Sequence, residues 1–351
     1  MFSLARLGRL LLVPLLCTAT ASARQESQPS QANDGKLYLD VVVTPKSGPP
    51  VSGLQQHDFT LLDNKVPRTI ASFRALGHSQ APLEIILVVD AVNTNYRTVA
   101  YEREEIDKFL HANGGHLAHP TAVAVFTDSG VQIQGEFSDD GNALSVSLDQ
   151  SVIRLRTIRR SGGIYGDAER LQLSLHALRQ IAEREAARPG RKVILWISPG
   201  WPMLTGARVY LPGSNEQNQI FTDIVSFSTL LREARITLYS IDPLGTADFG
   251  VRSSFWQDFT KGISKPSQTD IGDLALEVMA TQSGGLALNT DNDVAGLLQK
   301  CIGDADAYYE LAFDPPSSAK RDEYHRLEIK LTKPDLTART RQGYYAQPDI
   351  K

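Results

Sequence analysis

Residues 85–90 read Ile85-Ile86-Leu87-Val88-Val89-Asp90, an unbroken apolar run that ends in a carboxylate. A run of this kind is typical of a strand covered on both faces of a parallel sheet. Residues 193–197 form a second run of this kind, and residues 236–241 are predicted to form a further strand. Apolar residues recur at helical spacing around these runs, in segments 99–110, 171–181, 221–231, 271–279 and 294–302. This alternation predicts an α/β domain over residues 82–305 with a doubly wound, mostly parallel sheet.

The segments on either side of this domain alternate between apolar and polar residues with the period of two typical of half-buried strands. Strands are predicted before the domain at residues 37–43, 59–62 and 69–73, with Asp63-Asn64 as a turn, and after it at residues 308–313, 325–331 and 337–345. Each unit, 36–78 and 306–347, is too small to bury a core of its own. We therefore expect the two units to pack together as one β-rich module, with the α/β domain inserted between them in sequence.

The first 23 residues have the features of a secretory signal peptide. Arg6 and Arg9 are basic, residues 10–16 are mostly apolar, and Ala21-Ser22-Ala23 fits the pattern that signal peptidase cleaves. The apolar run is shorter than the roughly 20 residues that a membrane-spanning helix needs. An uncleaved anchor is the alternative interpretation. Residues 24–35 are polar and aperiodic and indicate a flexible leader.

Cleavage after residue 23 would place the mature chain in the periplasm or outside the cell. A lipoprotein modified at Cys17 is disfavoured, because Leu16 stands where a lipobox has a small residue. Cys301 is then the only cysteine of the mature chain, so no disulfide stabilises it. Cys301 follows other apolar residues at helical spacing, which indicates a buried structural thiol.

The charge balance argues against a nucleic-acid partner. The chain has 36 Lys and Arg against 40 Asp and Glu. Removal of residues 1–23 takes away two arginines and no acid, which leaves 34 against 40 and a net charge of −6. A mildly acidic surface repels phosphate backbones. No other apolar stretch approaches the length of a membrane span.

The residues around Asp90 resemble the von Willebrand factor A domain, in which an apolar strand ends in Asp before a Ser/Thr/Asn-rich loop and an amphipathic helix. The flanking segments resemble the VWFA-related family, which is found mostly in acidobacteria. These segments are LYLDVVVTPKSGPPVSGLQQHDFTLLDNKVPRTIASF at residues 37–73, YYELAFDPP at 308–316 and RLEIKLTKPDLTARTRQGYYA at 326–346. The resemblance covers residues 37–346, and it implies a module that recognises a protein or another ligand at the carboxyl edge of the sheet.

The resemblance also implies a magnesium site built from three loops at that edge. The first loop usually reads Asp-x-Ser-x-Ser, and here it reads Asp90-Ala91-Val92-Asn93-Thr94. Asp90 and Thr94 are therefore the candidate metal ligands. Asn93 and Asn95 are neighbouring residues with side-chain oxygens. These four residues are candidate ligand-binding residues as well.

The other two loops depart from the family pattern. Ile164 follows Gly162-Gly163 where a Thr is usual, and Ser198 stands after the second buried strand where an Asp is usual. Mg²⁺ requires octahedral oxygen ligation, usually with one or two carboxylates. We therefore expect a degenerate site without tight Mg²⁺ or Mn²⁺ binding and with no other cofactor. Asp90 is better interpreted as a cap of the turn that follows its strand.

Other chemistry is poorly supported by the sequence. Ser198 follows a buried strand, as a nucleophile would, but it lacks the paired glycines of a nucleophile elbow. His116 and His119 lie in a Gly/Pro-rich segment without the Glu of a zinc-binding helix, so a solvated loop is the default interpretation. The segments Asp139-Asp140-Gly141 and Asp291-Asn292-Asp293 lack the remaining spacing of a calcium loop and are expected to cap the helices that follow them.

Aromatic residues offer a second binding signal. Trp201 and Tyr210 follow the strand at 193–197, and Phe255-Trp256 lies in the long segment after the strand at 236–241. If exposed, these residues would form an apolar rim suited to a partner protein or peptide, and the alternative is that they are buried loop anchors. Ser198 and Trp201 complete the set of candidate ligand-binding residues.

The sequence thus favours an exported binding or adhesion-type module that is not an enzyme. The sequence does not identify the protein or peptide that this module would bind. Two alternatives stay open: a hydrolase that uses strand-end residues such as Asp90 and Ser198, and a structural subunit of an envelope assembly.

Overall fold

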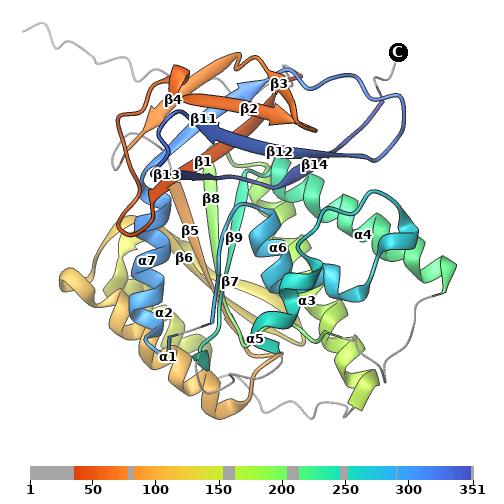
Figure 1. Ribbon diagram of the computed structural model, residues 1–351. Coiled ribbons are helices and arrows are strands. Elements are labelled where there is room, and N and C mark those ends of the chain that lie inside the picture. The colour runs from red at the N-terminus through yellow and green to blue at the C-terminus, as the bar shows by residue number, and fades with distance from the viewer. Residues whose placement is uncertain are drawn as a thin grey trace, which may run out of the picture. The chain divides into compact units, whose positions relative to one another are not determined.

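The computed structural model describes residues 35–77, 83–152, 163–203, 213–245, 252–289 and 291–348 (Figure 1). The predicted signal peptide, and the predicted leader except for its last residue, lie outside the described residues. The strands are β1 (Leu37–Pro45), β2 (Phe59–Asp63), β3 (Val66–Arg68), β4 (Ser72–Leu76), β5 (Leu83–Asp90), β6 (His116–Thr127), β7 (Gly130–Asp140), β8 (Arg191–Ile197), β9 (Ile236–Ile241), β10 (Ala287–Leu288), β11 (Tyr308–Phe313), β12 (Glu323–Leu331), β13 (Leu336–Arg339) and β14 (Gly343–Ala346). The helices are α1 (Tyr96–Leu110), α2 (Gly141–Val152), α3 (Gly163–Ala186), α4 (Ser214–Glu233), α5 (Arg252–Phe255), α6 (Leu276–Gln282) and α7 (Val294–Asp306).

The central sheet of the α/β domain has the order β10-β9-β8-β5-β6-β7. β5 pairs in parallel with both β6 and β8, and β9 and β10 continue the parallel order beyond β8. Only β7 is antiparallel, because it returns from β6 through a hairpin. The predicted fold class, a doubly wound and mostly parallel sheet, is confirmed. The chain order reverses at β5, so the switch point of the sheet lies beside this strand.

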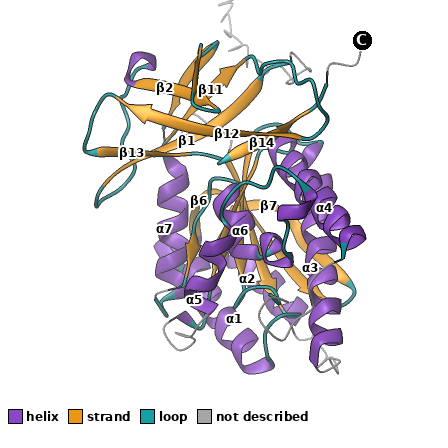
Figure 2. Cartoon of the chain, turned by 45° about the vertical axis from the view of Figure 1, so that its right-hand side comes forward, coloured by secondary structure: helices purple, strands orange, loops and turns teal. Residues whose placement is uncertain are grey.

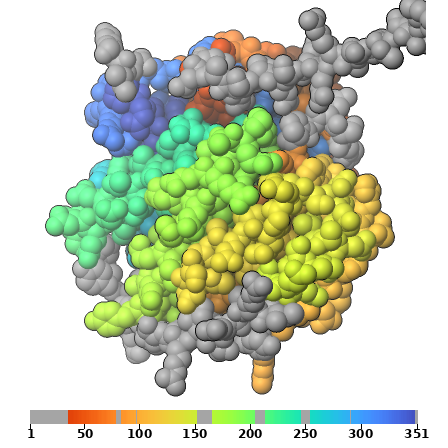
Figure 3. All heavy atoms as spheres, turned by 180° about the vertical axis from the view of Figure 1, so that it is seen from behind, coloured from red at the N-terminus to blue at the C-terminus, as the bar shows by residue number. Residues whose placement is uncertain are grey.

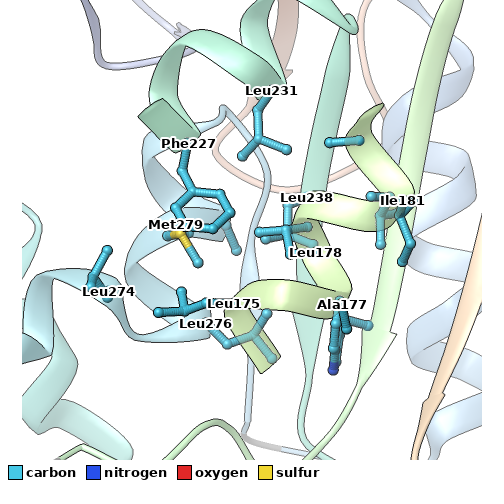
Figure 4. Close-up of a cluster of buried hydrophobic side chains, with 14 of the residues drawn as sticks. Leu175, Ala177, Leu178, Ile181, Phe227, Leu231, Leu238, Leu274, Leu276 and Met279 are labelled. Atoms are coloured by element: carbon cyan, nitrogen blue, oxygen red, sulfur yellow. The ribbon is translucent and has the colours of Figure 1, made fainter. Parts of the chain in front are cut away.

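Helices cover both faces of the sheet, which explains why β5 is apolar along its whole length (Figure 2). Ile86 and Val88 belong to one core cluster with residues of α3, α4 and α6, whereas Leu87 and Val89 belong to a second cluster with residues of α1, α2 and α7. Figure 4 shows side chains from α3, α4 and α6 packed around Leu238 of β9. Seen from behind, α3 and α4 lie side by side over the face of the sheet that includes Ile86 and Val88 (Figure 3).

The two β-rich units form one module, as the sequence predicted. Its sheets have the orders β13-β1-β11-β4 and β14-β12-β2-β3, so each sheet combines strands from both ends of the chain. Their shared core includes Leu39, Leu61 and Tyr309, which are at most 1% exposed. Phe59 packs on Tyr309 with the ring centroids 4.9 Å apart. We refer to these eight strands as the β-module.

Two local predictions for the β-module were incomplete. The predicted strand at 337–345 is two strands, β13 on β1 and β14 on β12, because the chain bends between them and crosses from one sheet to the other. A period-two pattern does not reveal such a crossing, since side chains alternate on both sides of the bend. The turn after β2 was predicted one residue early, at Asp63-Asn64, and the short strand β3 was not predicted. Asn64 and Lys65 have φ of 49° and 68°, which is the geometry of a tight hairpin turn.

The amino ends of β8 and β9 face the β-module. Arg235, which precedes β9, forms an ion pair of 2.6 Å with Asp40 of β1, and Arg191 at the start of β8 lies 3.7 Å from the same carboxylate. The carboxyl edge of the central sheet is therefore the end of the domain away from the β-module, toward the bottom of Figure 1. Among the described residues, no helix is both long and apolar enough to cross a membrane.

Candidate functional site

The candidate site lies where β5 and β8 end, at the switch point of the central sheet. In open α/β sheets this edge is where ligands bind. Asp90 is the last residue of β5 and Ser198 follows β8 directly, so the topology brings these two predicted residues to one edge. Both side chains are completely buried, at 0% exposure. Their contacts therefore decide what the edge can bind.

Asp90 is held by four N–H donors. Its Oδ1 accepts from the backbone N–H groups of Val92 (2.9 Å) and Asn93 (2.8 Å). Its Oδ2 accepts from Asn93 Nδ2 (2.8 Å) and from the indole Nε1 of Trp196 (3.1 Å). Asp90 thus caps the turn after β5, as the sequence predicted. The contribution of Trp196 was not predicted, because the residue lies within the apolar run of β8, is fully buried and looks like ordinary core.

Trp196 and Trp201 form an aromatic floor beneath the loop. Their ring centroids lie 5.2 Å apart in an edge-to-face arrangement, and Phe126 packs on Trp196 from β6 at 5.6 Å. Trp201 is 0% exposed. Of the two interpretations of Trp201, the buried loop anchor is therefore the one that the structure bears out, and its indole does not form an exposed rim.

Ser198 does not reach the surface either. Its Oγ accepts a hydrogen bond from the N–H of Gly200 at 3.1 Å, and its backbone N–H donates to the carbonyl of Ile241. Gly200 has φ of 94°, so this turn needs a residue without a side chain. The hydroxyl is thus a turn-stabilising group at the position where the family resemblance would place a carboxylate.

The asparagines after Asp90 shape the loop. Asn93 links Asp90 to α3, because its Nδ2 also contacts Ser174 Oγ at 2.9 Å. Asn95 is the N-cap of α1, and its Oδ1 accepts from the N–H of Thr98 at 3.0 Å. Thr94 is 5% exposed, and its Oγ1 has no hydrogen-bond partner within the described part of the chain. The predicted residues therefore form one connected loop in which only Asn95 is well exposed.

These residues do not fit a magnesium ion. All four N–H contacts of Asp90 occupy the oxygens that a cation would need. The third loop offers the neutral Ser198 in place of a second carboxylate. Across the described ranges, no group of three or more His, Cys, Asp or Glu side chains is arranged to hold a metal ion. The side-chain oxygens of Asp90 and Ser198 at this edge accept hydrogen bonds from N–H groups of the protein itself.

Glu102 is a component of the site that the sequence reasoning missed. It lies on the face of α1 that includes Val99 and Ile106, and it is 0% exposed. Neither carboxyl oxygen has a hydrogen-bond partner among the residues described. Burial, with further repulsion from Asp90 and Asp242, raises the pKa of Glu102 well above its ordinary value. A Glu three residues after Val99 and four before Ile106 could have signalled this, since it falls on the apolar face of the helix.

Glutamine at position 102 should stabilise the protein at alkaline pH. A carboxyl group whose pKa is raised on folding stabilises most below its unfolded pKa, and this contribution is lost as the pH rises through the folded pKa. Each unit of the increase corresponds to about 1.4 kcal/mol. We expect Glu102→Gln to leave the free energy of unfolding nearly unchanged at pH 4, below the unfolded pKa of about 4.5, and to raise it at pH 8. Urea denaturation at both pH values measures this difference.

The matched control for this prediction is Glu104→Gln on the exposed side of the same helix, where the side chain of Glu104 is 69% exposed. This variant should show no pH-dependent gain. Equal pH profiles for Glu102→Gln and the parent would contradict a neutral buried acid at position 102.

The first turns of α3 project beyond the loop. Ser174 lies beside Asn93 at the carboxyl edge, whereas Arg188, just after α3, contacts Glu84 near the start of β5 at 3.1 Å. α3 therefore runs antiparallel to β5, and the nine residues before Ser174 extend about 14 Å past the loop. Tyr165 lies in this extension and is 86% exposed, the highest value among the large apolar side chains of the described residues.

The other predicted aromatic and histidine residues have different environments. Phe255 and Trp256 are partly exposed, and Phe255 packs on Phe259 at 5.3 Å. Tyr210 lies outside the described residues. The default interpretation of a solvated His116-His119 loop was wrong for His119, which is 8% exposed and paired with Asp306 at the opposite, amino edge of the sheet. The β-strand register buries alternate residues there, which a Gly/Pro count does not reveal.

Three smaller predictions are confirmed. Asp140 accepts from the N–H of Ala143 at 3.1 Å, and Asp293 from the N–H of Gly296 at 2.9 Å, so both cap helices. Cys301 is a free, fully buried thiol, and burial raises its pKa. It is therefore a structural residue and not a reactive one.

Comparison with known proteins yields similarity of overall fold only. No protein-family model matches the chain, and no match was found among curated proteins. Similar solved structures include the human COPII-coat protein Sec24c, at 10% identity and a TM-score of 0.34, where the match covers 79% of this chain and 45% of that one. The manganese-loaded TRAP protein of Plasmodium vivax matches at 7% identity and a TM-score of 0.34, covering 77% and 96%. The SpRpn10 VWA domain matches at 11% identity and a TM-score of 0.28, covering 63% and 95%. At these values the similarity carries no information about function.

Proposed function

We propose that this chain is an exported, non-catalytic binding module of the von Willebrand factor A-like, VWFA-related type, which recognises a protein or peptide at the carboxyl edge of its α/β domain without a metal ion. The observation that carries the proposal is the closed hydrogen-bond network of Asp90. With its oxygens engaged by Asn93, Trp196 and the loop backbone, the edge is held in one conformation by the protein alone. A pre-organised surface of this kind favours recognition, because little conformational entropy is lost on binding.

The exposed groups near this edge suit a protein partner. Tyr165 presents an aromatic ring on the projecting turns of α3, and Asn95 presents a polar side chain from the loop. An exposed aromatic residue on a rigid element is a common anchor of protein interfaces. The partly exposed Phe255 and Trp256 provide further apolar surface.

A hydrolytic role for Ser198 is less favoured. The hydroxyl is completely buried and already accepts from Gly200, so a substrate would have to open the turn to reach it. The proposed module is therefore a binder. Export belongs to this proposal and rests on residues 1–23, so the mature chain should begin near Arg24.

The proposal is tested by capture from the envelope or medium of the native cell, with the chain from residue 24 onward as bait. A partner captured by the parent should be lost, or bound at least about 10-fold more weakly, after Tyr165→Ala. The matched control is Val66→Ala, since Val66 is 52% exposed in the β-module at the opposite end. Capture should persist in EDTA. Binding that EDTA abolishes, or that neither substitution affects, would contradict recognition at this edge.

A further inference from the structure

A cluster of arginines lies where the α/β domain meets the β-module. We call Arg191, Arg232, Arg235 and Arg341 the arginine junction. Arg191 begins β8, Arg232 lies in the last turn of α4, Arg235 precedes β9, and Arg341 lies between β13 and β14. The side chains of Arg191, Arg235 and Arg341 are largely buried, so each positive charge needs a compensating group.

Three of the four arginines have carboxylate partners. Arg235 pairs with Asp40 and with Glu310, at 2.6 Å each. Arg191 lies 3.7 Å from Asp40, and its guanidinium stacks over the ring of Tyr308 at 4.3 Å. Arg232 pairs at 3.1 Å with Glu233, whose side chain is 60% exposed. The buried carboxylates of the junction are thus already engaged by Arg191 and Arg235.

Arg341 is the exception. It is 8% exposed, and within the described residues no carboxylate lies at ion-pair distance from it. Its Nη1 donates one long hydrogen bond of 3.4 Å to the carbonyl of Ser228. Burial, together with repulsion from Arg232, lowers the pKa of Arg341 to about 9, against a smaller opposing attraction from Asp40. Asp40 is already engaged by Arg235 and Arg191, so the positive charge of Arg341 is only partly compensated.

A small cavity lies beside this guanidinium. It has a volume of about 20 Å³, and its lining includes Arg232, Arg235, Thr340 and Arg341. Two of the lining groups are buried without a hydrogen-bond partner in the described part of the chain, namely Nε of Arg232 and Oγ1 of Thr340. Asp40 also lines the cavity, but its oxygens face Arg235 and Arg191. The groups left over are an N–H donor and a hydroxyl beside a positive charge that is only partly compensated.

We propose that this cavity binds a small monovalent anion of about the size of chloride, held by Arg341, Arg232 and the hydroxyl of Thr340. The volume sets the size, because a cavity of this kind needs roughly 10–15 Å³ to hold one water molecule and a sulfate or phosphate ion is several times larger. Arg232 belongs to the α/β domain, whereas Thr340 and Arg341 connect two strands of the β-module. The anion would therefore join the two parts, and its binding should stabilise the whole fold.

The test is a chloride titration of the mature chain, with sodium gluconate replaced by sodium chloride at constant ionic strength. The expected result is a rise in melting temperature for the parent that grows with the logarithm of the chloride concentration above Kd, since the ligand binds only the folded state. Arg341→Met should lose this rise. Arg321→Met is the matched control, because the side chain of Arg321 is 82% exposed, and it should respond like the parent.

Thr340→Val provides a milder variant in case Arg341→Met does not fold. Loss of one hydroxyl donor should raise the Kd for chloride about 3- to 10-fold, so the rise in melting temperature should begin at a correspondingly higher chloride concentration. The line width of the ³⁵Cl resonance gives a direct readout and should broaden with the parent more than with Thr340→Val. A parent whose melting temperature does not rise when chloride replaces gluconate, or variants that respond as the parent does, would overturn the proposal.

Discussion

Replacement of Asp90 by alanine should lower the free energy of unfolding by about 3–5 kcal/mol. The substitution leaves four N–H groups without their acceptor, from Val92, Asn93 and Trp196, and these groups are buried under the loop. An unsatisfied buried donor costs roughly 1–3 kcal/mol, and partial relaxation of the loop reduces the sum. Urea or guanidinium denaturation followed by far-UV circular dichroism measures the change.

Two further variants, one conservative and one at an exposed control position, test this prediction. Asp90→Asn keeps the shape and one acceptor oxygen, so it should cost about half as much as Asp90→Ala. Asp128→Ala removes an exposed carboxylate from the turn between β6 and β7, and it should change stability by less than about 0.5 kcal/mol. An Asp90→Ala protein within about 1 kcal/mol of the parent would mean that the network does not hold the loop.

Deletion of residues 36–77 should abolish soluble folding of the remaining chain. The deletion removes β1, β2 and β4, which pair with β11, β12 and β13, and so exposes strand edges and the apolar faces of the β-module. It also removes Asp40, which leaves Arg191 and Arg235 with less compensation. Expression, sedimentation and thermal unfolding measure the outcome.

A point variant makes the same argument without a deletion. Leu61 is 0% exposed in the core of the β-module, so Leu61→Ala should lower the free energy of unfolding by about 2–5 kcal/mol. Val66→Ala, on the exposed side of the adjacent strand, should have little effect. If the deletion variant unfolded at the temperature of the parent, the two β-rich units would not share one core.

The fold could be predicted from the sequence because its elements carry strong periodic signals. The apolar runs of β5 and β8 indicate strands covered on both faces, and the spacing in α1, α3 and α7 indicates the helices that cover them. The bend between β13 and β14 could not be predicted, because it is set by contacts with distant parts of the chain, such as the hydrogen bond from the N–H of Gln342 to the carbonyl of Gln282.

The candidate site was harder to predict for a similar reason. Asp90, Asn93 and Asn95 were identified because they follow a strand in sequence and carry side-chain oxygens, and the role of Asn95 as the N-cap of α1 was not predicted. The partner that completes the network, Trp196, lies 106 residues away and looks like core by every local criterion. The burial of Trp201, the exposure of Tyr165 and the isolation of Glu102 likewise depend on packing between elements that sequence periodicity does not register.

Thermal unfolding with and without divalent metal tests the central claim most directly. The account predicts that Mg²⁺ or Mn²⁺ at about 5–10 mM moves the melting temperature of the parent and of Asp90→Ala by the same small amount, because the oxygens of Asp90 are engaged by N–H donors and Ser198 contributes no charge. A saturable stabilisation of the parent by metal that disappears in Asp90→Ala would contradict it. That result would mean that a cation displaces Trp196 and the loop N–H groups from Asp90.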